Sequence, residues 1–115
     1  ECSAEVRGRN LMNGLPETIV LSPFEVRAAI SEQVLSIVDS VVSCLVEAPP
    51  ELSQDVISRG IHLVGGGSLL RGMSERLSQS ADVPVSLVDA PLEAVVVGAG
   101  RCLESFEDVQ AMFME

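Results

Sequence analysis

The sequence predicts a mixed α/β fold, in which a β-hairpin is followed by a helix, a helix, a strand, a helix, a strand and a helix. Three observations support this order. Asn13-Gly14 is a turn signal between two β-prone segments, apolar residues recur at helical spacing over residues 26–45, and the β-formers of residues 61–64 run into three glycines. With 115 residues, 47% of them hydrophobic, the chain fits one domain with its own core.

The charge of the chain excludes several classes of function. There are 17 acidic and 7 basic residues, which gives a net charge of −10. Such an acidic chain has no electrostatic footprint for nucleic acid and no basic face for anionic lipid, so we expect no nucleic-acid partner. No apolar run approaches the roughly 18–20 residues that a membrane span needs, and the N-terminus does not read as a signal peptide.

Cysteine usage bears on the cellular setting. Cys2, Cys44 and Cys102 are odd in number, widely spaced and without a histidine cluster. They support neither a disulfide framework nor a zinc site, and they favour a reducing, cytoplasmic setting. The chain starts without a methionine, which we interpret as a piece of something longer.

The first expected element is a hairpin within residues 4–22. Residues 5–12 and 18–21 are the expected strands, Asn13-Gly14 is the turn between them, and Pro16 lies near the start of the second strand, where a missing N–H is tolerated. Alternation places Arg7 and Arg9 on one face of the first strand. That face either contacts a phosphate or a partner, or is a solvated face with acidic neighbours, which is the interpretation that composition favours.

A capping box predicts the start of a long helix. Ser22 can cap, Pro23 suits the first helical position, and Glu25 completes the box. The apolar residues that follow at helical spacing are Val26, Ala29, Ile30, Val34, Ile37, Val38, Val41, Val42 and Leu45. We expect this apolar stripe to pack in the core, and the alternative is that it forms a partner surface. The helix is expected to end at Pro49-Pro50.

The second half alternates helices and strands. The expected elements are a helix over 50–59 capped by Gly60, a strand over 61–64, a helix over 69–80, a strand over 83–88 and a helix over 91–104. The last segment is ambiguous because Val95-Val96-Val97 favours a strand, but Pro91 and Glu93 at its start favour a helix. Gly98 and Gly100 would let this helix pack closely on the sheet. The tail, residues 106–115, is acidic and partly apolar, and either docks elsewhere or frays.

The glycine turn is the candidate binding feature. Two strands joined by a helix predict a parallel pair, whose ligands lie beyond the strand C-terminal ends, where Gly65-Gly66-Gly67 stands. Bare backbone there either approaches a phosphate or nucleotide, or serves packing alone. A phosphate-binding P-loop needs a lysine, which the chain lacks, and the dinucleotide fingerprint needs a small residue where Leu70 stands. His62 has no catalytic partner nearby in sequence, so we expect a structural role and no catalytic constellation.

Three segments carry a family resemblance that runs over residues 5–104. They read EVRGRNLMNGLPETIVLS, EAPPELSQDVISRGIHLVGGGSLLRG and DAPLEAVVVGAG. Their order resembles the C-terminal part of the actin/Hsp70/sugar-kinase ATPase superfamily, and within it the MreB/Mbl family of rod shape-determining bacterial actin homologues. Two alternatives stay open: another ATPase of the superfamily, such as an Hsp70-like chaperone or a sugar/acetate kinase, and a nucleotide-free α/β interaction domain.

The resemblance implies a ribonuclease H-like, actin-type ATPase fold. Residues 1–22 would be the end of subdomain IIB, residues 23–105 most of subdomain IIA, and residues 106–115 a C-terminal tail. The implied cofactor is ATP, with Mg in the whole protein and the Mg ligands outside this chain. The residues that match the family's ATP contact are Gly65, Gly66, Gly67 and Ser68 beside the adenosine and phosphates, with Leu69 and Leu70 near the base or sugar.

The resemblance also implies partners and a location. The family polymerises into filaments under the cytoplasmic membrane and guides cell-wall synthesis, so self-association, morphogenesis proteins and the inner face of the membrane are expected for the whole protein. The family's catalytic aspartates, phosphate-binding loops and membrane-binding segment have no counterpart in this chain. We therefore expect no catalytic or metal-binding residue here, and a chain that by itself neither hydrolyses ATP nor makes normal filaments.

Overall fold

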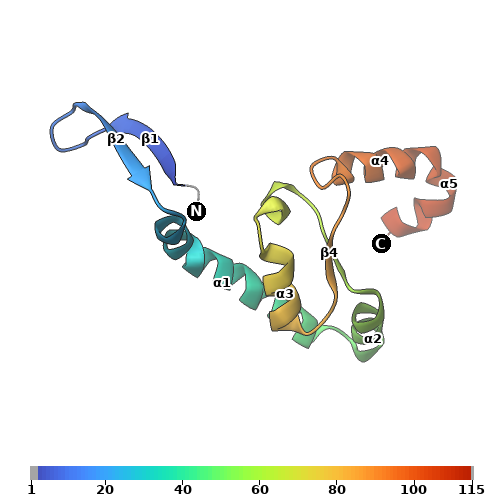
Figure 1. Cartoon of the computed structure of the whole chain (residues 1–115). Helices are drawn as coiled ribbons and strands as arrows, with labels where there is room; N and C mark the ends of the chain where they lie inside the picture. The colour runs from blue at the N-terminus through green and yellow to red at the C-terminus, as the bar shows by residue number, and fades with distance from the viewer. Residues whose placement is uncertain (1–2, 115) are drawn as a thin grey trace. The chain divides into compact units, whose positions relative to one another are not determined.

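The computed structural model describes residues 3–114, and the chain divides into two compact units, residues 1–39 and 40–115. The fold class is confirmed at this level: a β-hairpin precedes helices and a pair of parallel strands (Figure 1). The elements in chain order are β1 (Ala4–Arg9), β2 (Pro16–Leu21), α1 (Pro23–Glu47), α2 (Pro50–Arg59), β3 (Ile61–Leu63), η1 (Gly66–Leu69), α3 (Met73–Ala81), β4 (Val85–Leu87), α4 (Ala94–Glu104), α5 (Phe106–Val109) and η2 (Gln110–Phe113).

The hairpin of the first unit is confirmed, but its predicted two-residue turn is wrong. β1 pairs antiparallel with β2 from Ala4↔Leu21 to Arg9↔Pro16, so the loop covers residues 10–15. The physical reason lies in two asparagine side chains. Asn10 Oδ1 accepts from the Met12 N–H at 2.8 Å, and Asn13 Oδ1 accepts from the Leu15 N–H at 2.9 Å. These local bonds compete with the strand ladder and end β1 early.

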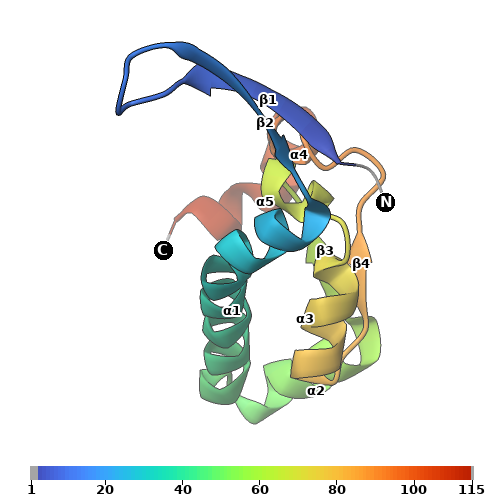
Figure 2. The same cartoon turned by 60° about the vertical axis from the view of Figure 1, so that its left-hand side comes forward.

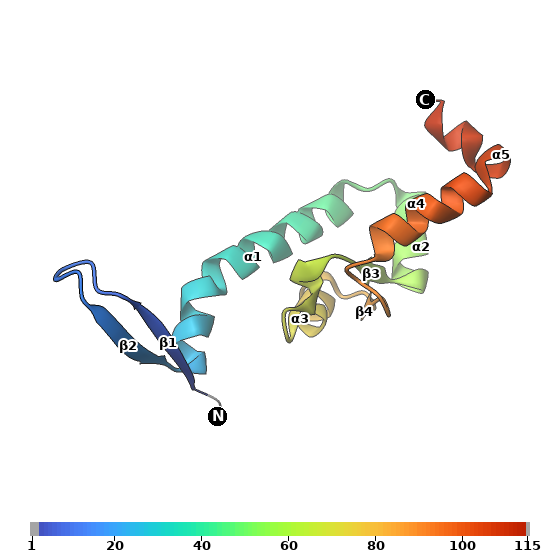
Figure 3. The ribbon, with the colours of Figure 1, turned by 90° about the horizontal axis from the view of Figure 1, so that it is seen from above.

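The capping box at the start of α1 is confirmed. The Ser22 N–H and hydroxyl both donate to Glu25 Oε2 at 2.8 Å, and the Glu25 N–H donates to Ser22 Oγ at 3.2 Å. Two otherwise unpaired backbone N–H groups are satisfied in this way, which explains why the helix begins at Pro23. The helix runs unbroken to Glu47, as the proline pair that follows predicts (Figure 3).

The expectation that α1 buries a broad apolar stripe is only partly met. Val38 is its buried residue, at 4% exposure, whereas Val26 and Ile37 on the same stripe are 45% and 48% exposed. The helix is also long and apolar enough to cross a membrane, with a mean hydropathy of 1.6. The expectation that no apolar segment approaches the length of a membrane span is therefore wrong. Length and composition alone do not separate such a span from the core helix of a soluble protein.

The second unit is built on β3 and β4, which pair in parallel as predicted, with Ile61 opposite Val85 and Leu63 opposite Leu87. Helix α3 contacts β4 (Figure 2). The buried hydrophobic side chains of this unit, among the described residues, are Met73 and Leu77 of α3 and Val83 ahead of β4. This small cluster holds the helix against the strand pair.

Glycines decide where the helices of this unit begin and end. The helix predicted over 69–80 begins only at Met73, after the short η1, because Gly72 takes a left-handed conformation with φ of 85°. Gly60 ends α2 as predicted, with φ of 80°, and its N–H donates to Val56 O at 2.8 Å. A Cβ at Gly60 would lie 2.5 Å from Pro84 O, so the backbone itself is the close neighbour here.

The C-terminal segment is helical, as predicted, although α4 begins at Ala94 rather than Pro91. The expectation that Gly98 and Gly100 pack closely on the sheet is wrong for the described residues, since a Cβ at either would meet no atom within 4 Å. The tail forms the helical turns α5 and η2 (Figure 3). The rings of Phe106 and Phe113 stack with centroids 6.4 Å apart.

Candidate functional site

The glycine turn leaves the C-terminal end of β3 and is tied to the segment that leaves β4. Gly65 begins it with φ of 83° and ψ of 167°, and its N–H donates to Pro91 O at 2.7 Å. One residue on, a Cβ at Gly66 would lie 3.3 Å from Leu92 Cδ2. The two segments therefore meet beyond the carboxyl ends of two parallel strands, which is where α/β sheets bind ligands.

Ser68 closes the turn internally. Its hydroxyl donates to Gly65 O at 2.5 Å, and its N–H donates to the same oxygen at 3.3 Å. Because the hydroxyl is used in this bond and the side chain is half-buried, Ser68 shapes the turn in this structure. The first N–H groups of a helical turn have no partner within it, which leaves those of Gly66 and Gly67 as donors toward an outside group.

The surface that the turn offers is bare backbone flanked by apolar side chains. Gly66 and Gly67 are exposed, and a Cβ at Gly67 would meet nothing within 4 Å, so no described part of this chain requires a glycine there. Leu69 and Leu70 are 52% and 42% exposed. N–H donors beside apolar side chains suit the binding of a ligand with an anionic part and a flat apolar part.

Sequence reasoning missed the contribution of Pro91 and Leu92 to this site. In the sequence, Asp89-Ala90-Pro91 indicates a helix start, whereas in the structure the Pro91 carbonyl and the Leu92 side chain complete the turn. The available signal was topological, because residues that follow neighbouring parallel strands lie at the same edge of the sheet. His62 is exposed and its Nδ1 lies 3.1 Å from Ser86 Oγ, one strand away, which fits the structural role expected.

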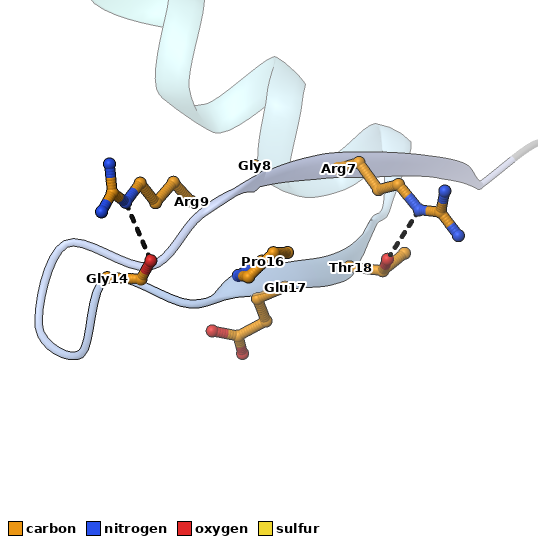
Figure 4. Close-up of a pocket in the computed structure, with 7 residues that line it drawn as sticks. All are labelled: Arg7, Gly8, Arg9, Gly14, Pro16, Glu17 and Thr18. Carbon is orange, nitrogen blue, oxygen red and sulfur yellow. Dashed lines mark hydrogen bonds between the residues drawn. The ribbon is translucent and has the colours of Figure 1, made fainter.

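A hollow of about 650 Å³ lies in the hairpin, and both arginines of β1 line it (Figure 4). Arg7 Nε donates to Thr18 Oγ1 at 3.4 Å, and Arg9 Nε donates to Gly14 O at 2.8 Å. Both arginines are exposed, as the solvated-face interpretation predicts. The acidic neighbour Glu17 accepts from Asn10 Nδ2 at 2.6 Å, and within residues 3–114 neither arginine forms an ion pair.

Metal binding has no support in the described part of the chain. No group of three histidine, cysteine or acidic side chains is placed to hold an ion among residues 3–114. Cys44 is an exposed free thiol and Cys102 a half-buried one, whereas Cys2 lies outside the described residues.

Comparison with known proteins gives one family. The sequence profile of the MreB/Mbl protein family matches residues 1–111. The cell shape-determining protein Mbl of Bacillus subtilis is 39% identical over 102 residues, which are 89% of this chain and 31% of that protein. MreB of Escherichia coli is 40% identical over 103 residues, which are 90% of this chain and 30% of that protein.

Solved structures agree with the sequence comparison. MreB 5 of Spiroplasma citri bound to AMPPNP superimposes with a TM-score of 0.86 and 26% identity, over 98% of this chain and 34% of that one. The same protein bound to ADP gives a TM-score of 0.85 and 28% identity, over 91% of this chain and 32% of that one. The chain thus spans about 30% of the length of its curated relatives. Since the family profile covers nearly all of it, this chain belongs to the MreB/Mbl family of actin-like, cell shape-determining bacterial cytoskeletal proteins.

Proposed function

We propose that this chain supplies one wall of the ATP site of an actin-like cytoskeletal protein. The observation that carries the proposal is the glycine turn at the carboxyl ends of β3 and β4. The Gly65–Pro91 hydrogen bond ties this turn to the segment that follows β4. One solved relative that superimposes on the chain, MreB 5 of Spiroplasma citri, was crystallised once with AMPPNP and once with ADP. The family match sets aside the chaperone and kinase alternatives.

Each residue of the turn has a part in this proposal. The N–H groups of Gly66 and Gly67 face the phosphates or the adenosine, where a side chain would keep the nucleotide away. Ser68 holds the turn in shape through its bond to Gly65 O. Leu69 and Leu70 cover the base or sugar with their exposed side chains. The Mg²⁺ that accompanies ATP, and the groups that would catalyse hydrolysis, belong to the rest of the whole protein.

The proposed subdomain boundaries follow from the resemblance to the MreB/Mbl family. Residues 1–22, with the hairpin, form the end of subdomain IIB, and residues 23–105 form most of subdomain IIA in a ribonuclease H-like fold. Residues 106–115 are the C-terminal tail. Support comes from the hairpin followed by helices and parallel strands, and from the superposition on the solved relatives.

At the level of the whole protein, we propose assembly into filaments that hydrolyse ATP and lie in the cytoplasm at the inner face of the cell membrane. There they would guide cell-wall synthesis together with morphogenesis proteins and so maintain rod shape. The support is family membership, since the curated relatives are cell shape-determining proteins.

A chimera tests the nucleotide site. This chain would replace the corresponding part of Escherichia coli MreB, and a fluorescent ATP analogue would be titrated into the purified protein. We expect Gly67→Val to weaken binding by about tenfold or more, roughly 1.4 kcal/mol, because the new side chain occupies space that only the nucleotide uses. Gly100→Val is the matched control, since its Cβ also meets nothing within 4 Å. Equal binding by both variants would contradict the proposal.

A further inference from the structure

Leu92 is an exposed leucine that lies at the glycine turn but belongs to another segment. It stands on the connection between β4 and α4, whereas Leu69 and Leu70 follow β3 (Figure 1). Its side chain is 64% exposed, against 52% and 42% for those two leucines. A single apolar residue on a surface is ordinary, but this one stands at the edge of a strand pair where ligands bind. Leu92 therefore extends the apolar surface of the turn from a second segment.

The backbone on both sides of Leu92 is held by hydrogen bonds. On one side, Pro91 O accepts from the Gly65 N–H at 2.7 Å. On the other side, the Val97 N–H donates to Glu93 O at 2.9 Å and begins α4. Leu92 is the residue between these two anchors. A side chain whose backbone is fixed before binding loses less conformational entropy when it contacts a ligand.

Two glycines of the turn have different neighbours, and Leu92 is the neighbour of one. A Cβ at Gly66 would lie 3.3 Å from Leu92 Cδ2, which is a tight contact, whereas a Cβ at Gly67 would meet nothing within 4 Å. Gly66 therefore lets Leu92 approach the backbone of the turn, and Gly67 leaves open space. Because Leu92 is held against the turn and still mostly exposed, its side chain adjoins the place where the turn receives a ligand.

Charge indicates which part of a nucleotide Leu92 would meet. Asp89 and Glu93 flank the Pro91-Leu92 pair in sequence, and both are exposed. Like charges repel, so carboxylates on this segment disfavour the approach of a triphosphate. The adenine base carries no charge at neutral pH and offers a flat apolar face, which suits an exposed leucine. The phosphates are instead favoured at the N–H donors of the turn.

We propose that Leu92 contacts the adenine base of the bound nucleotide, as an apolar contact additional to those of Leu69 and Leu70. Both segments that leave the strand pair then hold the nucleotide, and its phosphates are directed away from Asp89 and Glu93. The inference rests on the nucleotide site of the proposed function, to which it adds a binding residue and an orientation of the ligand.

Photolabelling of the chimera tests which segments adjoin the base. The probe is an ATP analogue with an azide on its adenine, which attaches to neighbouring residues in light. Trypsin cleaves after arginine, so the turn is released on residues 60–71 and Leu92 on residues 77–101. We expect both peptides to be labelled, with the label of the second at residues 91–93, and excess ATP to prevent the labelling. Label on residues 60–71 alone would overturn the proposal.

Substitution of Leu92 measures the contact. In the chimera, Leu92→Ala should weaken ATP binding by about fivefold, because apolar area that the base covers is lost. Leu92→Met keeps the volume and should bind within about twofold of the unsubstituted chimera. Leu103→Ala, at a position of α4 that is 76% exposed, is the matched control and should leave binding unchanged. Circular dichroism melts of every variant show whether the fold is retained.

The variants separate failure of this contact from failure of the proposed function. If Gly67→Val weakens ATP binding but Leu92→Ala binds as tightly as the unsubstituted chimera, the function stands and the Leu92 contact is removed. Loss of binding by Leu92→Ala and Leu92→Met alike, together with a lower melting temperature, would mean that Leu92 only supports the fold, which also overturns the contact. If the unsubstituted chimera binds no ATP, the proposed function and the contact both fall.

Discussion

The hairpin loop and the glycine turn are both exposed, but they are built from different parts of the chain. In the loop of residues 10–15, side chains make the structure: Asn10 and Asn13 bond to backbone N–H groups, and Arg9 bonds to a carbonyl. In the turn that begins at Gly65, backbone bonds predominate, among them the one to Pro91 O, and the Ser68 hydroxyl adds a single side-chain bond to Gly65 O. The first loop therefore presents apolar side chains outward, and the second presents N–H groups.

This difference indicates which residues of each region can be substituted without loss of stability. A loop built by side chains depends on particular polar groups and leaves its outward residues free to serve a contact. A turn built by backbone depends on conformations that only glycine adopts easily, and side chains added to it either strain the chain or fill the space of a ligand. Substitutions in the two regions separate these two kinds of dependence.

The largest effect is expected at Gly60, in the backbone-built unit. Its φ of 80° and ψ of −172° lie in a region almost restricted to glycine, and a Cβ would meet Pro84 O at 2.5 Å. Gly60→Ala should lower the free energy of unfolding by roughly 3–4 kcal/mol, as strain and overpacking add. Urea denaturation followed by circular dichroism measures it. A loss below about 1 kcal/mol would mean that strands β3 and β4 can separate here at little cost.

The next effect concerns the glycine turn itself. Gly65→Ala forces alanine into φ of 83° and ψ of 167° and should lower the free energy of unfolding by about 2 kcal/mol. Gly67→Ala is the matched control, because Gly67 has helical backbone and a Cβ there would meet no atom within 4 Å. For this variant we expect the free energy of unfolding to change by no more than about 0.5 kcal/mol. Equal losses at the two positions would show that the turn depends on flexibility and not on the conformation of Gly65.

A smaller effect is expected in the side-chain-built loop. Asn10→Ala removes the bonds of its side chain to the Met12 N–H and to Glu17 Oε2, and should lower hairpin stability by about 1–2 kcal/mol. Asn13→Ala removes the one bond to the Leu15 N–H and should cost about half as much. Amide hydrogen exchange of β1 and β2 reports the change. If neither variant speeds exchange, the loop is held by its backbone bonds alone.

The smallest effect is a pH dependence at the start of α1. The backbone N–H of Ser22, and then its hydroxyl, hold the pKa of Glu25 below its usual range. A lowered pKa in the folded state means that this contribution is present above the ordinary glutamate pKa and is lost as the pH falls through the folded value. The protection factors of the first α1 amides, which are their exchange rates corrected for the intrinsic rate at each pH, should therefore fall at acid pH. Ser22→Ala should remove most of that dependence, and an unchanged profile would contradict the assignment.

Local signals predicted most of the elements correctly. The start of α1 is predicted by Ser22 and Glu25, its end by the proline pair, and the end of α2 by Gly60. These signals succeed because helix caps and helix breakers act within a few residues. Local signals failed where two of them competed. Asn13-Gly14 resembles a two-residue turn, yet the Asn10 side chain bonds to Met12 first and gives a longer loop. Gly72, which delays the helix predicted from Leu69 to Met73, carries no signal that distinguishes it from a tolerated helical glycine.

The sequence by itself determined the order of elements, the parallel pair and the family, because these depend on periodicity, caps and motifs that are written along the chain. The tertiary structure decided that Pro91 and Leu92 complete the glycine turn, since contacts between segments that follow different strands depend on how those strands pair. It also decided that Leu11, Met12, Val46 and Ile57 stay exposed. Burial depends on which neighbours a residue meets in space, and hydrophobicity along a sequence does not state what those neighbours are.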